Sequence, residues 1–317
     1  MPDPALTERF ATALARLNPD GAPIGLAVSG GPDSLALLLL AQATIPGRFQ
    51  VATVDHGLRA AAADECALVA RICAERRVPC AVLPVTVSEG NVQAMAREAR
   101  YAALAQWAAQ AGLAAVATGH HADDQAETLL LRLNRGCGLA GLAGVRDSVE
   151  IGGLRVIRPL LDVRRAELAA VCAAAGATPV ADPSNDDPQY DRARLRQALA
   201  NGAGADWLDP HAVARTARNL ADAYAAVQDY AALLWDSQVR AEGAGFVLAP
   251  VSSREMNRRL VAAIMEQLGG RPRGGDVAGL LGKLERGERG NVAGVLGQVR
   301  GAVWVFGPEP ARRGGAA

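Results

Sequence analysis

The chain has 317 residues, of which 50% are hydrophobic and 4% aromatic, so it is long enough for two domains and too apolar for a disordered protein. Its 33 basic and 33 acidic residues give a formal net charge of +0, which excludes a uniformly basic nucleic-acid-binding protein. The 5 cysteines form no Cys-x-x-Cys pair, which argues against a zinc knuckle or a cluster site, and reduced thiols are typical of the cytoplasm. Neither a signal peptide nor a membrane span is expected.

The first two-thirds of the chain alternates apolar, strand-like runs with helical patterns. Strands are expected over 24–28, 50–54, 80–87 and 114–118, and helices over 35–43, 62–76, 91–111 and 123–134. Strands separated by helices of this length predict βαβ units and a doubly wound parallel sheet that is covered on both faces.

The pattern changes after this region. Residues 136–153 are Gly-rich and loop-like, a helix is expected over 164–175, and residues 190–242 are nearly all helical in pattern. A smaller unit follows, with strands expected over 246–249 and 298–306 and a helix over 253–268. We therefore predict a catalytic α/β domain over 1–205 and, over 206–317, a helical linker with a small α+β domain.

The C-terminal segment carries a positive surplus. Between Arg254 and Arg313 there are eleven Lys or Arg and six Asp or Glu, and eleven minus six gives +5. Arg254 and Arg258 are four apart on the expected helix, so they could form a stripe that faces phosphate. A solvated surface with a chance surplus is the alternative.

The main motif joins the first strand to the first helix and consists of Ser29, Gly30, Gly31, Pro32, Asp33 and Ser34. Doubly wound sheets bind ligands at the carboxyl ends of their strands, where this loop lies. Gly30 and Gly31 let the backbone approach a phosphate, the N–H groups of the following helix point at an anion, and Ser29 and Ser34 can add hydroxyl donors. Asp33 is unusual in an anion site unless it holds Mg²⁺. A Gly-Gly-Pro turn with a capping residue is the structural alternative.

Two further groups of polar residues follow expected strands. Asp55 and His56 end the second strand, beside the first loop if the strand order is 2-1. His120, Asp124 and Glu127 follow the fourth strand at i, i+4 and i+7, and they share one face if the helix includes His120. Such a row could bind a metal, orient a base or bind a cation. N-capping by Asp123 with a solvated acidic face is the alternative.

Arginines and turn residues complete the set of candidates. Arg97 and Arg100 lie one turn apart on a helix, where a surface pair is the alternative to a functional role. The segment from Asp182 to Asp187 is rich in short turn-forming acceptors. Three arginines follow at alternate positions, which is not a helix face: Arg192, Arg194 and Arg196.

Together these motifs resemble a known family. The loop at Ser29–Ser34 is similar to the PP-loop of the N-type ATP pyrophosphatases, which carry Ser-Gly-Gly-x-Asp-Ser after the first strand. Over about residues 24 to 200 the chain resembles the tRNA(Ile)-lysidine synthetases, on four further motifs: Val54-Asp55-His56-Gly57-Leu58-Arg59, Gly119-His120-His121-Ala122-Asp123-Asp124-Gln125-Ala126-Glu127-Thr128, Arg158-Pro159-Leu160-Leu161 and Asp182-Pro183-Ser184-Asn185.

The resemblance implies an activity. It implies ligation of L-lysine to carbon 2 of the wobble cytidine in the tRNA(Ile) with a CAU anticodon, so that the tRNA reads AUA in place of AUG. ATP would be split into AMP and pyrophosphate through an adenylated tRNA. The alternatives are another PP-loop adenylating tRNA-modifying enzyme, such as a thiolase, and an ATP-binding regulatory module without chemistry. A homodimer is compatible with the sequence.

The resemblance also implies roles for residues. It assigns ATP binding to the Ser29–Ser34 loop with Asp55 and His56, Mg²⁺ binding to Asp33, and lysine binding to Asp182 and Asn185, without a permanent metal or cluster. The catalytic set is Asp33, Arg100, His120, Asp124, Glu127 and Arg192. The family's Arg-Asn-x-x-Arg run lacks its Asn here, where Ala193 follows Arg192, and this leaves the roles of Arg194 and Arg196 open.

Overall fold

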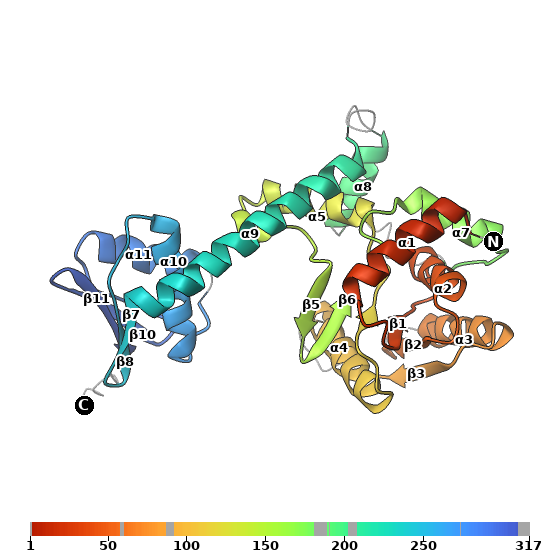
Figure 1. Cartoon of the computed structure of the whole chain (residues 1–317), viewed down its shortest axis with the longest axis horizontal. Coiled ribbons are helices and arrows are strands. Elements are labelled where there is room, and N and C mark those ends of the chain that lie inside the picture. The colour runs from red at the N-terminus through yellow and green to blue at the C-terminus, as the bar shows by residue number, and fades with distance from the viewer. Residues whose placement is uncertain are drawn as a thin grey trace. The chain divides into compact units, whose positions relative to one another are not determined.

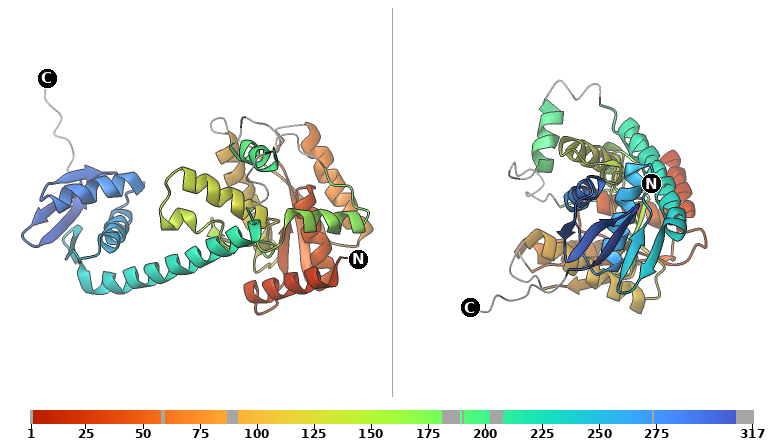
Figure 2. Two further views of the ribbon diagram at one scale, coloured as in Figure 1. Left: turned by 90° about the horizontal axis from the view of Figure 1, so that it is seen from above. Right: turned by 90° about the vertical axis from the view of Figure 1, so that its left-hand side faces the viewer.

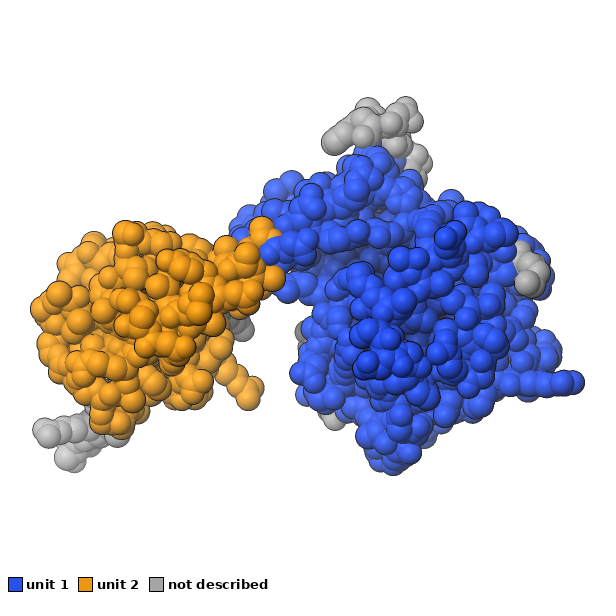
Figure 3. Space-filling model, viewed as in Figure 1, with its two compact units in different colours: residues 1–222 blue, residues 223–317 orange. Residues whose placement is uncertain are grey.

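The structure is a computed structural model that describes residues 2–57, 60–86, 92–180, 189, 191–201, 208–272 and 274–309. It divides into two compact units, unit 1 over residues 1–222 and unit 2 over residues 223–317 (Figure 3). Unit 1 contains a mostly parallel sheet and unit 2 an antiparallel one.

Unit 1 is built on a six-stranded sheet of order β3-β2-β1-β4-β6-β5. Its strands are β1 (Ile24–Ala27), β2 (Phe49–Asp55), β3 (Cys80–Pro84), β4 (Val116–Ala117), β5 (Ser148–Ile151) and β6 (Leu154–Ile157). All neighbours pair in parallel except β5, which pairs antiparallel with β6 at the edge. The doubly wound sheet predicted from the sequence is therefore confirmed, including the 2-1 order of the first two strands.

Helices cover both faces of this sheet (Figure 1). The helices that lie in unit 1 are α1 (Pro4–Leu17), α2 (Pro32–Thr44), α3 (Ala60–Glu75), α4 (Val92–Gln110), α5 (Ala122–Asn134), α6 (Leu139–Leu142), α7 (Arg165–Ala174) and α8 (Asp191–Asn201), and α9 (Pro210–Gln238) begins in unit 1 and ends in unit 2. Side chains of α1, α2, α3 and α7 share one core with β1, as Phe10, Leu37 and Leu168 illustrate. Tyr101, Leu104 and Trp107 of α4 form a second core with other residues of the sheet. Because α2 is apolar on every side, it is buried between the sheet and its neighbouring helices.

The region 136–153, expected to be a loop, contains α6 and β5. The β5–β6 hairpin turns at Gly152 and Gly153, with φ of 57° and 77°, and a two-residue turn with positive φ values matches the twist of the flanking strands. Each strand has 4 residues, too few for a clear alternating pattern. The helix α1 was not predicted either.

Unit 2 packs α10, α11 and the last part of α9 against a five-stranded antiparallel sheet of order β7-β8-β11-β10-β9 (Figure 2). Its elements are β7 (Val239–Glu242), β8 (Gly245–Leu248), α10 (Arg254–Gln267), α11 (Gly274–Glu285), β9 (Gly290–Val292), β10 (Val295–Arg300) and β11 (Val303–Pro308). Leu260, Ile264, Leu280 and Phe306 are fully or almost fully buried between helices and sheet. The predicted α+β class is confirmed.

Two details of unit 2 differ from the sequence predictions. Residues 239–242, expected to be helical, form β7, and the single strand expected over 298–306 is the β10–β11 hairpin. The division between the units falls after Asp222, inside α9, whereas the pattern indicated a boundary near residue 205. The reason is that the first turns of α9 pack on unit 1, where Ala217 is buried and Arg218 pairs with Asp162.

Among the described residues, no helix combines the length and apolarity that crossing a membrane requires.

Candidate active site

The PP-loop sequence forms a closed turn between β1 and α2. Gly30 has a φ of 86°, a conformation that favours glycine. The Ser34 hydroxyl donates to the Gly31 carbonyl at 3.0 Å and accepts the Ser29 N–H at 3.1 Å. Ser34 therefore holds the loop together, a use of its hydroxyl that the sequence did not indicate. Because no described side chain caps α2 at Gly31, the N–H groups of its first turn remain available for an anion.

The segment that follows β4 packs directly against this loop at Gly119. A Cβ atom on Gly119 would lie 3.0 Å from the carbonyl carbon and oxygen of Asp33 and 3.1 Å from the backbone nitrogen of Ser34. A larger residue would push the loop away. The second motif predicted from the sequence thus contacts the first through its glycine.

His121 is the N-cap of α5. The Asp124 N–H donates to His121 Nδ1 at 3.4 Å, and the His121 N–H donates to Asp124 Oδ2 at 3.2 Å, which together form a capping box. Since α5 begins at Ala122, His120 lies before the helix, so the condition under which His120 would share a helix face with Asp124 and Glu127 is not met. The alternative of N-capping by Asp123 is wrong.

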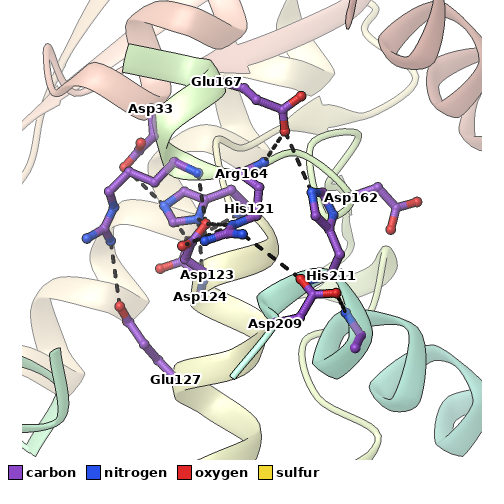
Figure 4. Close-up of polar contacts among 12 residues, drawn as sticks. Asp33, His121, Asp123, Asp124, Glu127, Asp162, Arg164, Glu167, Asp209 and His211 are labelled. Atoms are coloured by element: carbon purple, nitrogen blue, oxygen red, sulfur yellow. Dashed lines mark hydrogen bonds and ion pairs between the residues drawn. The ribbon is translucent and has the colours of Figure 1, made fainter. Parts of the chain in front are cut away.

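Asp123 instead joins α5 to the start of α7 (Figure 4). Its carboxylate accepts a hydrogen bond from the backbone N–H of Arg165 at 2.8 Å and another from Arg164 Nε at 3.4 Å. Arg165 is the first residue of α7, so Asp123 satisfies one of its free N–H groups.

Three carboxylates surround the His121 ring, which is 0% exposed. His121 Nε2 lies 3.4 Å from Asp33 Oδ2 and 3.6 Å from Asp124 Oδ2, and Nδ1 lies 3.6 Å from Asp123 Oδ2 (Figure 4). Burial lowers the pKa of His121, but the neighbouring carboxylates of Asp33 and Asp124 outweigh burial and raise it. We did not select His121 from the sequence, although its place three residues before Asp124 is the spacing of a capping box.

His120 lies beside this cluster and is uncharged at neutral pH. Burial lowers its pKa to about 4, against an opposing effect of Asp124. Three arginines lower the pKa further: Arg158, Arg100 and Arg192. Arg100 and Arg192, two arginines selected from the sequence, therefore both help to keep His120 uncharged.

Glu127 is 3% exposed and is held by arginines. Arg196 donates to it from Nε at 2.7 Å and from Nη2 at 3.0 Å, and Arg165 Nη2 lies 3.7 Å away. From the same helix, α8, Arg192 donates to the Thr128 hydroxyl at 2.7 Å. Arg196, whose role the sequence left open, thus anchors α8 to α5.

The remaining predicted residues are placed as follows. Asp55 ends β2, and its Oδ1 accepts a hydrogen bond from the N–H of Gly57 at 2.9 Å. His56 is the residue between these two in the sequence. Arg100 lies on α4, with its guanidinium carbon 5.1 Å from the ring centre of Tyr101. Asp182 and Asn185 lie outside the described residues.

The residues present fit a cation at Asp33. Oδ1 of Asp33 is buried and has no hydrogen-bond partner among the residues that the structure describes. Within the same residues, no group of three or more His, Cys, Asp and Glu could hold a metal ion by itself. A Mg²⁺ ion here would therefore need phosphate oxygens as additional ligands, as is usual for this ion in nucleotide sites.

Comparisons with known proteins agree with this geometry. The PP-loop domain matches residues 4–203. A tRNA(Ile)-lysidine synthase of Novosphingobium aromaticivorans is 46% identical over 311 residues, which cover 96% of this chain and 94% of the relative. A tRNA(Ile)-lysidine synthase of Zymomonas mobilis is 40% identical over 306 residues, which cover 93% of this chain and 91% of the relative. The solved structure of the U34-tRNA thiolase NcsA from Methanococcus maripaludis with its 4Fe-4S cluster shares the fold, with a TM-score of 0.54 and 16% sequence identity. The match covers 68% of this chain and 80% of the thiolase chain. The chain therefore belongs to the PP-loop family and, within it, to the tRNA(Ile)-lysidine synthases.

Proposed function

We propose that the protein ligates L-lysine to carbon 2 of the wobble cytidine in the CAU-anticodon tRNA(Ile), splitting ATP into AMP and pyrophosphate. One observation supports this beyond family membership. The PP-loop carboxylate of Asp33 and the α5 carboxylate of Asp124 lie 3.4 Å and 3.6 Å from the same His121 nitrogen. A loop suited to ATP activation and a candidate base are therefore neighbours, as a two-step ligation requires.

Nucleotide binding follows from the loop and the helix behind it. Gly30 and Gly31 leave room for phosphate oxygens, and the first-turn N–H groups of α2 face them. Asp55 and His56, on the neighbouring strand, are our candidates for contacts to the adenine and ribose. Asp33 Oδ1 would hold Mg²⁺, which when bound neutralises charge on the phosphates.

In the first step, the oxygen on carbon 2 of the cytidine attacks the α-phosphorus of ATP, and the bond to the β-phosphate oxygen breaks. The residues of the protein make no covalent bond in this step. Their task is to position the reactants and to balance negative charge on the phosphates. Arg100 and Arg192, whose charges act together at His120, are our candidates for that balance.

In the second step, the side-chain amine of lysine attacks carbon 2 and AMP leaves. This amine has a pKa of about 10.4 in water, so it must lose a proton before it can attack. Asp124 is better suited to accept the proton than Glu127, because Glu127 already accepts two hydrogen bonds from Arg196. Lysine binding by Asp182 and Asn185 remains part of the proposal.

We place the reaction in the cytoplasm. We assign the positioning of the tRNA to unit 2. The arginine stripe suggested by the sequence is largely neutralised inside unit 2, since Arg254 pairs with Glu285 and Arg258 pairs with Glu255. Arg259 is buried on Tyr224, with its guanidinium carbon 4.6 Å from the ring centre. A role in tRNA binding therefore depends on the shape of the unit as well as on its charge.

Pyrophosphate release is the experiment that separates the candidate functions. A lysidine synthase should release pyrophosphate continuously only when both tRNA(Ile) and lysine are present. A thiolase on the same fold would require a sulfur donor in place of lysine. A regulatory module would bind ATP without releasing pyrophosphate under any of these conditions.

A further inference from the structure

Thr118 and His120 are joined by a hydrogen bond just after β4 ends. Thr118 Oγ1 and His120 Nδ1 lie 2.9 Å apart. The backbone N–H of Thr118 donates to the carbonyl of Ile157, the last residue of β6, at 3.0 Å, and Thr118 is 8% exposed. The Thr118 hydroxyl is therefore fixed by the sheet, and it holds the His120 ring at one of its two nitrogens.

The surroundings of the Thr118 hydroxyl show which group donates in this hydrogen bond. His120 Nδ1 is the only hydrogen-bond partner of the hydroxyl among the described residues. If Nδ1 carried the proton, the hydroxyl hydrogen would be left without an acceptor there, and an unpaired buried donor is costly. If the hydroxyl donates to Nδ1, both groups are satisfied. The proton of the neutral His120 ring then lies on Nε2.

The side chains around His120 carry an excess of positive charge. The charges that act at His120 include those of Asp124 and of three arginines, Arg100, Arg158 and Arg192. Among the described residues, none of these arginines forms an ion pair with a carboxylate. Arg158 is 5% exposed, and its Nε is buried without a hydrogen-bond partner in the same part of the chain. Unneutralised arginines and an unused buried donor suit an anion.

We propose that Thr118 is a positioning residue, which keeps the proton of His120 on Nε2 so that this N–H group donates a hydrogen bond to an anionic oxygen of a substrate. Nε2 has no hydrogen-bond partner among the described residues, and His120 is half-buried, so a ligand can reach it. The ring keeps its proton throughout and acts as a neutral donor, which the neighbouring arginines do not repel. The inference rests on the proposed function, whose substrates offer such an oxygen on the α-phosphate of ATP and on the carboxylate of lysine.

The position of the His120 proton can be measured by NMR on the full-length protein. The ¹⁵N shifts of protonated and unprotonated ring nitrogens differ widely, and the chain has 4 histidines, so labelling them with ¹⁵N yields few signals. The signals that disappear in His120→Gln belong to His120. We expect the proton on Nε2 at neutral pH and none on Nδ1. A proton on Nδ1 would overturn the proposal.

Thr118→Val and Thr118→Ser separate the hydroxyl from the packing of the side chain. Val keeps the shape of Thr without the hydroxyl, whereas Ser keeps the hydroxyl. In Thr118→Val we expect part of the His120 rings to carry the proton on Nδ1. Lysine transfer should slow by at least about tenfold, because removing one well-placed donor from a transition state costs up to about 10²–10³-fold. Thr118→Ser should retain both the tautomer and the rate. In Thr118→Val, a slower reaction with an unchanged tautomer, or a changed tautomer with a normal rate, would contradict the assignment.

Ligand titrations of the unaltered protein identify the anion and cover the case in which Thr118→Val fails to fold. ATP and lysine would be added separately, with adenosine and cadaverine as controls that lack the phosphates and the carboxylate. A shift of the His120 Nε2 signal with ATP but not adenosine identifies the phosphate, and one with lysine but not cadaverine identifies the carboxylate. Bound ligands that leave Nε2 unaffected, or controls that shift it equally, would overturn the proposal. If calorimetry detects binding of neither ATP nor lysine, the underlying function is refuted instead.

Discussion

Arg196 donates two hydrogen bonds to Glu127, from Nε at 2.7 Å and from Nη2 at 3.0 Å. The pair joins α8 to α5, and the same α8 carries Arg192, whose guanidinium bonds Thr128. The position of Arg192 in the site therefore depends on a contact made one helical turn further along.

Replacing Glu127 with Gln should destabilise unit 1 and weaken both reaction steps. The carboxylate is 3% exposed, and removing one partner of a buried ion pair costs about 3 kcal/mol or more. Urea unfolding would measure the loss. The double variant Glu127→Gln, Arg196→Gln is the matched comparison, and it should lose less than the sum of the single variants. Additive losses would mean that the pair does not hold α8.

Asp124→Asn should separate the two steps. Asn can still accept the His121 N–H, so the start of α5 is retained, but it cannot take a proton from lysine. We expect the first round of pyrophosphate release to continue, lysine transfer to fall by at least about 10²-fold, and adenylated tRNA to accumulate. Radiolabelled AMP bound to tRNA would report the intermediate. Transfer at the normal rate would remove Asp124 from the mechanism.

Gly119→Ala should impair ATP binding. The added methyl group would meet the Asp33 backbone at 3.0 Å, and overpacking of this kind costs about 1–3 kcal/mol. ATP affinity should fall about tenfold, as measured by calorimetry. The matched control is Gly138→Ala, because a Cβ at Gly138 meets nothing within 4 Å. Equal ATP affinity in both variants would show that β4 does not support the loop.

Stability should rise with pH between about 4 and about 6.5 through His120. Its folded-state pKa is about 4, below the usual value near 6.5, so in this range the unfolded chain binds the extra proton. The contribution is complete above pH 6.5, amounts to roughly 3 kcal/mol for such a shift, and disappears as pH falls towards 4.

Unfolding of the wild type and His120→Gln, measured at several pH values, isolates this contribution. The difference between the two proteins should grow with pH across the range. His211→Gln, which removes a histidine outside the site, is the matched control. A difference that stays constant from pH 4 to pH 6.5 would contradict the assignment.

Residues 1–222 alone should bind ATP and lose tRNA modification. Unit 1 has its own cores and contains every described site residue. Phosphate contacts position an RNA, so the loss should appear as weaker tRNA binding with a smaller dependence on salt. Unchanged tRNA affinity and salt dependence in the truncated protein would refute this role of unit 2.

Much of unit 1 was predictable because its signals are local. The apolar run before Ser29 and the polar residues after β2 and β4 mark strand ends, and parallel strands bring such ends to one edge. His121 and Arg196 were not predictable in the same way. Their roles depend on where α5 begins and on how α8 docks, and a pattern of residues leaves both of these open by a turn or more.

The most direct test of the proposed function is mass spectrometry of nucleosides from tRNA(Ile) incubated with the protein, ATP and isotope-labelled lysine. We expect one cytidine-derived nucleoside to gain labelled lysine, only when ATP is present, in equal amount to the AMP released. A control tRNA with another anticodon should remain unmodified. Sulfur in the product, or tRNA recovered without labelled lysine while ATP is consumed, would contradict the proposed function.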